Sequence, residues 1–400
     1  MTYYRRTRLM LAGAALVSLS GPAFAIDGTD LLNKINAAYA PQGHAITATS
    51  VKVDGSTVTL SGVGIARVGA PATDGTIGDV SLDGVEEDGQ GGYGIASIKF
   101  PNINVTEDGV NLTAQDLSLT NVTIPADATQ NSLSSLILYE KAQSGPVKFT
   151  KDGAEVFSLT GITSNLAKRD NASGLDFDFL ASGLKGDVSR IDDPATREAL
   201  QKLAITQVEG DVSVAGGWDL ATGTVDLEEY ALNLNDIGRL SLGFSFSGYT
   251  MELMRSLQES MKAIETAGAN DDQAKQAAGL AVMGLAQQLN FNSASLSFED
   301  ASITSRLLDY AGKEQGVSGT QMAQTVKAMV PLMVAQLNIP ELQNAISAAV
   351  TEFIDDPQSI TISAEPESPV PFPMIMGAAM GAPNTLPKVL GVTVSANDQM

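Results

Sequence analysis

Apolar and polar residues alternate in short runs between positions 46 and 249. The stretches LDFDF from Leu175 and LSLGFSF from Leu240 place an apolar side chain at every second position. A period of two is typical of a strand with one face on an apolar core, and Gly, Asn and Asp separate these runs. The first part of the chain is therefore predicted to be a series of antiparallel strands, interrupted by helices at 132–144 and 193–203.

A short phrase recurs four times along these strands. It reads TLSGV from Thr59, SLDGV from Ser81, SLTNV from Ser118 and SLTGI from Ser158. Its two apolar residues stand three apart, so they would face opposite sides of a flat strand. One extra residue, a β-bulge, returns both to the same side, and Gly or Asn tolerates the left-handed backbone that such a bulge requires. A tight turn at the same residue is the alternative. Either way, strands bent at intervals predict a curved, trough-like sheet.

Helical spacing replaces the alternation at Thr250. The segment TMELMRSLQESMKAI places Leu253, Leu257 and Ile264 on one helical face behind a Thr250 cap. Further helices are predicted at 271–289, at 305–314, from Ser318 with Gln321 completing a capping box, and from Pro340 to Ile354, with Pro331 kinking or ending the helix that starts at Ser318.

Short strands are predicted between these helices. They begin near Ser295, Ser359 and Val389, where apolar residues again alternate. The segment AEPESPVPFPM from Ala364 contains four prolines and is predicted to be an extended, polyproline-like crossing. The second part of the chain is thus α+β, with strands that can complete the sheet of the first part.

Together these patterns predict a β-rich α+β fold, with a long curved antiparallel sheet, interspersed helices and a helical C-terminal part. The predicted organisation is a signal peptide at 1–25, a strand-rich curved-sheet region at 26–249 and a helix-rich region at 250–400. No methionine lies between Ile26 and Tyr249, whereas eleven lie in the last region. Two interpretations of this enrichment are an adaptable binding surface and, preferred, helix-forming core residues.

The N-terminus has the three-part layout of a secretory signal peptide. Arginines at positions 5, 6 and 8 precede an apolar run at 9–17 and the sequence Ala23-Phe24-Ala25. The run is about half the roughly 20 residues that cross a bilayer. Cleavage after Ala25 and a periplasmic location are predicted. The mature chain is expected to be soluble, or held at a membrane by partners, with no integral span after cleavage.

Charge and cysteine content exclude several classes of partner and site. The chain has no cysteine, which excludes disulfides and thiolate metal sites. The chain has 24 basic and 46 acidic residues, so losing three signal-peptide arginines leaves 21 − 46 = −25. Such a body repels nucleic acid and anionic lipid head groups. Neither a metal nor a cofactor is expected.

No catalytic motif has its companion residues. His44 is the single histidine, and the glycines at 89–94 precede a strand rather than a helix, so they are interpreted as a hairpin turn. The S-x-x-K at 182–185 lacks the S-D-N and K-T-G motifs that accompany it in penicillin-binding proteins. Asp176 and Asp178 are interpreted as the wet face of a strand. The protein is therefore predicted not to be an enzyme.

Runs such as LTAQDLSLTNVTIPA from Leu112 and YALNLNDIGRLSLGFSF from Tyr230 resemble the AsmA-like and YdgA-like bacterial envelope proteins. The resemblance implies a long curved β-sheet with an apolar groove and a link to lipid movement or outer-membrane homeostasis. The chain departs from many of these proteins in having a cleavable signal peptide where they keep a membrane anchor.

Two functions follow as hypotheses. The first is a non-catalytic envelope protein of structural or interaction type, with a role in envelope homeostasis. The alternative is a periplasmic protein that binds a lipid or another apolar ligand in its trough. The ligand-binding residues would then include Leu119, Val122, Leu234 and Phe244, and the partners would be lipid or envelope proteins. Helices from Thr250 onward packed over the trough would favour the first, and an open trough the second.

Overall fold

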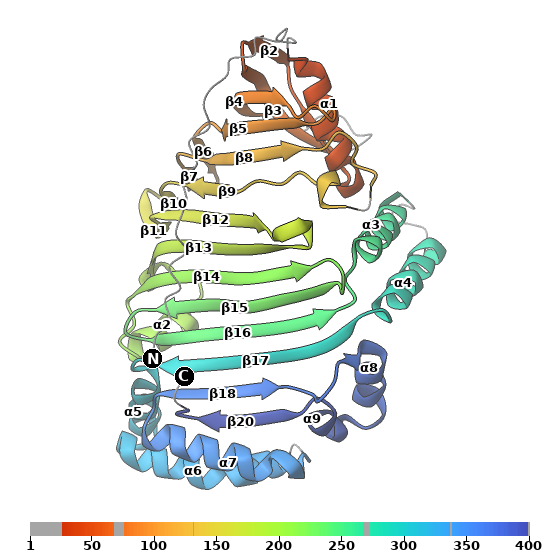
Figure 1. Ribbon diagram of the computed structural model, residues 1–400. Helices are drawn as coiled ribbons and strands as arrows, with labels where there is room; N and C mark the ends of the chain where they lie inside the picture. Colours follow the sequence, from red (N-terminus) through yellow and green to blue (C-terminus); the bar gives the residue numbers. More distant parts are fainter. Residues whose placement is uncertain (1–25, 68–75, 131, 267–271, 337, 399–400) are drawn as a thin grey trace, which may run out of the picture.

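The computed structural model describes residues 26–67, 76–130, 132–266, 272–336 and 338–398 (Figure 1). In these ranges twenty strands form one sheet whose pairs are all antiparallel, and the helices gather toward the C-terminal part. The predicted β-rich α+β fold is confirmed. The predicted signal peptide lies outside the described residues. Within them, no helix combines the length and apolar character needed to cross a bilayer.

The α-helices are α1 Gly28–Tyr39, α2 Pro194–Lys202, α3 Met251–Thr266, α4 Asp272–Ala286, α5 Ile303–Gln315, α6 Gly319–Gln336, α7 Pro340–Asp355, α8 Phe372–Gly381 and α9 Leu386–Val389. The strands are β1 His44–Thr47, β2 Ser50–Asp54, β3 Thr57–Arg67, β4 Thr76–Glu87, β5 Tyr93–Lys99, β6 Ile103–Glu107, β7 Val110–Ala114, β8 Ser118–Ile124, β9 Lys141–Ser144, β10 Val147–Lys151, β11 Ala154–Leu159, β12 Gly161–Lys168, β13 Gly174–Asp187, β14 Gln207–Asp219, β15 Thr224–Leu234, β16 Gly238–Ser247, β17 Asn290–Asp300, β18 Ser359–Ala364, β19 Val370–Pro371 and β20 Val392–Ala396.

Neighbouring strands of the sheet follow the chain almost in order (Figure 1). The main series runs β3, β4, β5, β8, β9, β12, β13, β14, β15, β16, β17, β18 and β20, with β1 and β2 both paired on the outer edge of β3. A side arm of β6, β7, β10 and β11 joins the second half of β13. The pairing of β16 with β17 carries the sheet across the predicted boundary at 249/250.

Left-handed residues bend the strands at three of the four recurring phrases. Gly62 has φ 56°, and the register of β3 against β4 shifts between Leu60 and Val63. Gly84 has φ 66° and Asn121 has φ 50°. The tight-turn alternative is wrong at these positions because each strand continues through the residue.

The prediction of a left-handed residue is wrong at the fourth phrase. Gly161 has no positive φ and begins β12 after a break from β11. The left-handed residue lies instead on the neighbouring strand, at Gly183 with φ 62°, where β13 shifts register against β14. This bulge also accounts for the S-x-x-K at 182–185, which contains Gly183.

The helix predicted at 132–144 is also wrong. A single turn of 3-10 helix at Leu133–Ser135 is followed by β9, whose residues pair with β8 and β12. Strand partners on both sides outweigh the local helical pattern, since β9 fills a position inside the sheet.

Two later predictions depend on prolines. Helix α6 continues through Pro331 to Gln336, so the alternative that the helix ends at Pro331 is wrong. The extended crossing predicted from Ala364 is only partly correct, because β19 ends at Pro371 and α8 starts at Phe372, with Pro373 in its first turn. Proline fits the first turn of a helix because its missing N–H has no helical partner there.

The other predictions for helices and strands agree with the structure. Helices α2 to α7 and strands β17, β18 and β20 lie within a few residues of their predicted ranges. Ser318 and Gln321 form the predicted capping box, with hydrogen bonds of 3.0 and 3.2 Å. Helix α1 had not been predicted. Its N-terminal cap is Asp27, and Leu31 and Ile35 are buried one turn apart.

Candidate apolar groove

One face of the sheet carries a row of side chains that is apolar except at Ser164. Residues paired across antiparallel strands point to the same face, so the register of the strands traces this row from strand to strand. It reads Val58, Leu82, Ile98, Leu119, Ala142, Ser164, Phe179, Val214, Tyr230, Leu242, Leu296, Ile362 and Val394, on β3, β4, β5, β8, β9, β12, β13, β14, β15, β16, β17, β18 and β20. We call this face of the sheet the apolar face.

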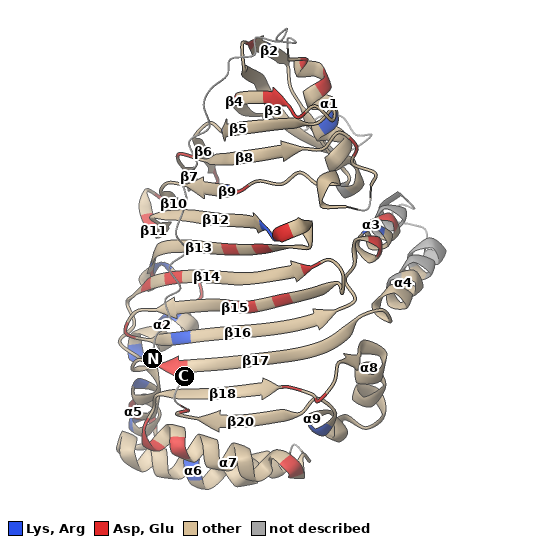
Figure 2. Ribbon diagram, viewed as in Figure 1, with Lys and Arg blue, Asp and Glu red and all other residues tan. Residues whose placement is uncertain are grey.

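The opposite face is polar. The row next to the apolar one, one residue along each strand, reads Thr163, Leu180, Ser213, Ala231, Ser241, Ser297, Thr361 and Ser395. Asp176 and Asp178 of β13 lie on this side by register and are exposed, as the sequence predicted. Figure 2 shows the acidic positions along β13. The sheet is therefore amphipathic along its whole main series, and its two faces call for different surroundings.

Three helices cover parts of the apolar face. Leu31 and Ile35 of α1 pack on β3, β4, β5 and β8. Met251 of α3 packs with Trp218 of β14 and Leu175 of β13. At the other end Phe353 of α7 packs on the strands β17, β18 and β20. The apolar face is therefore closed at its ends and along one margin.

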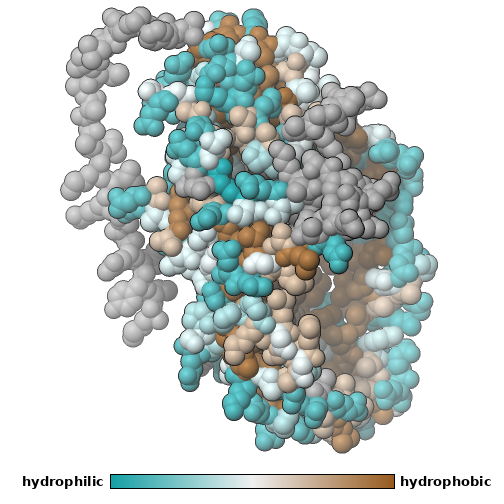
Figure 3. All heavy atoms as spheres, turned by 90° about the vertical axis from the view of Figure 1, so that its right-hand side faces the viewer, coloured by the Kyte–Doolittle hydropathy of each residue, from teal (hydrophilic) through white to brown (hydrophobic). Residues whose placement is uncertain are grey.

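Among the described residues, no helix side chain covers the apolar face at β15 to β18 in this way. Tyr230, Leu242, Leu296 and Ile362 are consecutive members of the row and are 39% to 49% exposed, and Leu240 beside them is 46% exposed. Seen from the side of α3, α4 and α8, the lower half of the molecule has a hollow with apolar walls (Figure 3). Since the other face of these strands carries serines and threonines, this hollow is the apolar face. We call the exposed part, formed by β15 to β18, the open groove.

A cavity of about 470 Å³ lies on the same face at the end covered by α1. Its volume falls in the range of small-molecule sites, about 300 to 1,000 Å³. His44, at the start of β1, is the one basic side chain among the lining residues, and Tyr39 contributes a phenol; the other lining residues are apolar. The lining is Ile35, Tyr39, His44, Ile46, Leu60, Val63, Ile65, Ile77, Val80, Leu82, Ile98, Phe100, Leu119, Val122, Ile124 and Ile137.

A polar contact holds α1 over this cavity. The Tyr93 hydroxyl donates to Asp30 at 2.8 Å, and Lys34 forms an ion pair with the same carboxylate. The hydrogen bonds from Lys34 and Tyr93 lower the pKa of Asp30. Burial and the neighbouring Asp30 raise the pKa of Tyr93, so its hydroxyl remains a donor at any physiological pH. The helix is thus fixed to β5 by one buried donor and one charged acceptor.

Aromatic rings line the margin of the open groove near α3. Neighbouring ring centroids are 5.6 to 6.1 Å apart along the series Trp218, Tyr249, Phe246, Phe244 and Phe291. Trp218 also donates its indole N–H to the Tyr249 carbonyl at 2.8 Å. Tilted rings at these separations stabilise one another beyond their burial, so this margin is a firm wall.

The structure places the four predicted ligand-binding residues on the apolar face but at different points along it. Leu119 and Val122 line the cavity under α1. Phe244 belongs to the aromatic wall, and Leu234 lies at the far end of β15, two residues beyond Leu232. The exposed residues Leu240, Leu242, Leu296 and Ile362 had not been predicted. Alternation within each strand revealed their face, but only the register between strands brings them together.

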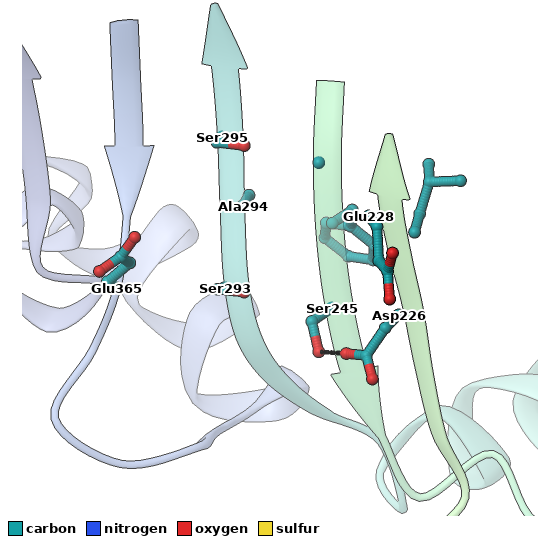
Figure 4. A pocket seen from close by; sticks show the side chains of 10 residues that line it. Asp226, Glu228, Ser245, Ser293, Ala294, Ser295 and Glu365 are labelled. Carbon is teal, nitrogen blue, oxygen red and sulfur yellow. Dashed lines mark hydrogen bonds between the residues drawn. The ribbon is translucent and has the colours of Figure 1, made fainter. Parts of the chain in front are cut away.

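Polar side chains line a smaller pocket between β15, β16 and β17. It has a volume of about 270 Å³, and Asp226, Glu228 and Glu365 contribute its carboxylates (Figure 4). Ser245 donates its hydroxyl to Asp226. Glu228 is the extra residue of a bulge, because β15 shifts register against β16 between Leu227 and Tyr230. Among the residues described, no group of three or more His, Cys, Asp or Glu is placed to hold a metal ion.

The residues considered for catalysis occupy ordinary structural positions. Lys185 forms an ion pair with Glu209 at 3.1 Å, and Ser182 donates to the Gly161 carbonyl. The glycines at 89–94 form the hairpin turn between β4 and β5, where Asp88 accepts from the backbone of Gln90 and Gly92. The hairpin interpretation is confirmed.

Comparisons with known proteins reach only part of the chain. A family model described as "uncharacterized protein" matches residues 231–397, from within β15 to just beyond β20. The comparison with curated proteins gives no match. The resemblance to AsmA-like and YdgA-like proteins has no counterpart in these comparisons and stays a prediction. The matched segment contains four of the five exposed residues of the open groove, namely Leu240, Leu242, Leu296 and Ile362.

Proposed function

We propose that this protein is a non-catalytic, exported protein that binds the acyl chains of a lipid along its apolar face. The observation that carries the proposal is the run of exposed side chains at Tyr230, Leu240, Leu242, Leu296 and Ile362. Large continuous apolar surfaces are rare on proteins that work alone and mark sites for ligands, partners or membranes. A groove open along several strands suits a long, thin apolar ligand better than a compact one.

The free energy available from such a ligand is sufficient for stable binding. Each buried methylene contributes about 0.8 kcal/mol, so a chain of about 15 carbons gains roughly 12 kcal/mol before ordering costs. The aromatic wall along β14 to β17 gives one side of the groove a fixed shape, which lowers the cost of ordering the protein. The resemblance to AsmA-like envelope proteins and the signal-peptide pattern support a lipid of the periplasmic space.

A structural or interaction role in the envelope is the second candidate. The observation in its favour is α7, whose Phe353 packs against Phe298 with ring centroids 6.3 Å apart and covers the last strands. If the helices after Thr250 covered the remaining strands in the same way, no ligand would be needed. The exposure of Leu242 and Leu296 favours the lipid-binding function instead.

The test is binding of a fluorescent phosphatidylcholine to the mature protein, purified without detergent. Leu296→Glu places a charge in the open groove, at a side chain that is already 44% exposed. We expect it to weaken binding by at least about tenfold, because a carboxylate in contact with an acyl chain loses solvation. Native mass spectrometry of the unmodified protein should also show copurified lipid.

Leu180→Glu is the matched control. Leu180 is 43% exposed and lies on the polar face, where it pairs with Thr163 and Ser213. The same substitution there should leave binding unchanged. Equal binding by the unmodified protein and Leu296→Glu, or an equal loss in both variants, would overturn the proposed groove and favour the structural role.

A further inference from the structure

Helix α8 is apolar around its whole circumference and is not buried. Its sequence, FPMIMGAAMG, contains no polar side chain, and none of its residues is classed as buried. Met374 is 57% exposed and Met380 is 87% exposed. At 100° per residue Met374 and Met376 point to opposite sides of the helix, and Met376 is exposed as well. A water-soluble protein helix with no polar side is ordinarily enclosed by protein.

The end of α4 exposes apolar side chains as well, at Leu280 and Met283. The chain leaves α4 for β17, and the Phe372 N–H at the start of α8 donates to the carbonyl of Leu289, three residues after the end of α4, at 3.1 Å. The chain has a net charge of −22, yet the segments 276–298 and 368–387 contain no charged residue (Figure 2).

This surface adjoins the open groove. Strand β19, which leads directly into α8, pairs its Val370 with Phe291 of β17. Phe291 is the last ring of the aromatic wall, 5.8 Å from Phe244. Figure 1 shows α8 beside the ends of β17 and β18, on the side where α3 and α4 also lie. The end of the open groove at Phe291 is thus joined to α8 by the two-residue strand β19.

The shape and charge of the surface distinguish between possible occupants. A protein partner covers one side of a helix, whereas a bilayer surrounds an inserted helix on several sides. With ten residues α8 is about 15 Å long, too short to span a bilayer but long enough to lie in its interface. An anionic surface would repel the acidic protein, so a charge-free contact region suits neutral or zwitterionic lipid.

We propose that α8 and the adjoining end of α4 dock this protein on a bilayer of zwitterionic phospholipid, where acyl chains pass between the bilayer and the open groove. Docking stands on the properties of α8 itself, while the passage of acyl chains rests on the proposed lipid-binding function. Methionine suits this surface because its flexible, polarizable side chain adapts to disordered neighbours. The preferred interpretation of the methionines as core residues is correspondingly wrong for six of the nine whose side chains are described, which are exposed.

Vesicle flotation tests the docking surface. The mature protein is mixed with phosphatidylcholine vesicles and centrifuged through a density gradient. We expect the unmodified protein to float with the vesicles, and the double variant Met374→Glu with Met380→Glu to lose about tenfold or more of its bound fraction. The control is Met329→Glu with Met333→Glu, two exposed methionines on the separate helix α6, which should float normally.

A second readout separates docking from ligand binding. The α8 variant should still bind fluorescent phosphatidylcholine supplied as monomers, whereas Leu296→Glu should lose that binding and still float. Vesicles enriched in phosphatidylglycerol should bind the protein more weakly at low salt. Absence of flotation, equal loss in the α6 control, or tighter binding to the anionic vesicles would overturn the docking proposal and leave groove binding to be judged by its own assay.

Discussion

Replacing Gly84 by alanine tests whether left-handed glycines shape the sheet. Gly84 has φ 66°, and a Cβ placed on it would lie 2.7 Å from the Cβ of Ala96 on the facing strand β5. The left-handed conformation costs a non-glycine residue about 1 to 2 kcal/mol. Overpacking at a fixed strand spacing adds about 1 to 3 kcal/mol. We therefore expect Gly84→Ala to lower the free energy of unfolding by about 2 to 5 kcal/mol.

Gly55→Ala separates the two contributions. Gly55 lies in the turn between β2 and β3 with φ 60°, and no atom lies within 4 Å of the position of its added Cβ. This variant should show the conformational cost alone, about 1 to 2 kcal/mol. Adding Ala96→Gly to Gly84→Ala removes the close contact, so it should recover part of the loss although glycine in a strand costs about 0.5 to 1 kcal/mol itself.

Guanidinium titration measures these differences. Trp218 is the single tryptophan and is buried, so its fluorescence reports unfolding of the central strands. Circular dichroism follows the loss of secondary structure in the whole protein. If Gly84→Ala and Gly55→Ala lose the same stability, the contact with Ala96 does not matter. If Ala96→Gly recovers nothing in the double variant, the facing strands adjust their spacing and the bulge does not fix the curvature.

Three further outcomes are expected. Asn121→Gly should change stability by less than about 0.5 kcal/mol in the same titration, because φ 50° suits glycine, whereas Asn121→Val should lose about 1 to 2 kcal/mol. Tyr93→Phe should loosen α1, which would be seen as faster amide exchange in that helix. Because the pKa of Asp30 is lowered in the folded protein, the stabilisation from Asp30 is present at neutral pH and is lost as the pH falls below about 4. The difference in exchange between the two proteins should therefore shrink in acid. The mature protein should begin at Ile26 by intact mass, and recovery of the uncut chain from cells would contradict the signal-peptide prediction.

Local sequence patterns were sufficient for most of the strands and for the bulges. Alternation depends only on the pleat of each strand, so it identified the apolar face of LDFDF and LSLGFSF without knowledge of their neighbours. The spacing of Leu60 and Val63 on either side of Gly62 likewise predicts the bulge locally, since both residues must reach the same side and are buried in one cluster. At Gly161 the same phrase led to a wrong prediction, because the left-handed residue is Gly183 on the neighbouring strand.

Interactions between distant segments account for what the sequence did not reveal. The row from Tyr230 to Ile362 depends on the register of four strands. Its consecutive members are 12, 54 and 66 residues apart in the chain (242 − 230, 296 − 242 and 362 − 296), so no local pattern links them. Helix α8 was not predicted because four prolines precede Met374 in this segment; they favour extended chain locally, although Pro373 is compatible with a first helical turn. Its exposure depends on where β19 attaches to β17.

The open groove draws on both predicted regions of the chain. Tyr230 and Leu242 come from strands before Tyr249, and Leu296 and Ile362 from strands after Thr250, yet the four are consecutive partners in one row. Neither region could form the groove alone, because each would end in an open strand edge at β16 or β17 with half of the exposed row. Helices α1 and α7 close the two ends of the face, and α8 lies at its margin. The apolar face is long, closed at both ends and exposed between them. An apolar ligand would therefore enter at its margin, beside the helix that has no polar side chains.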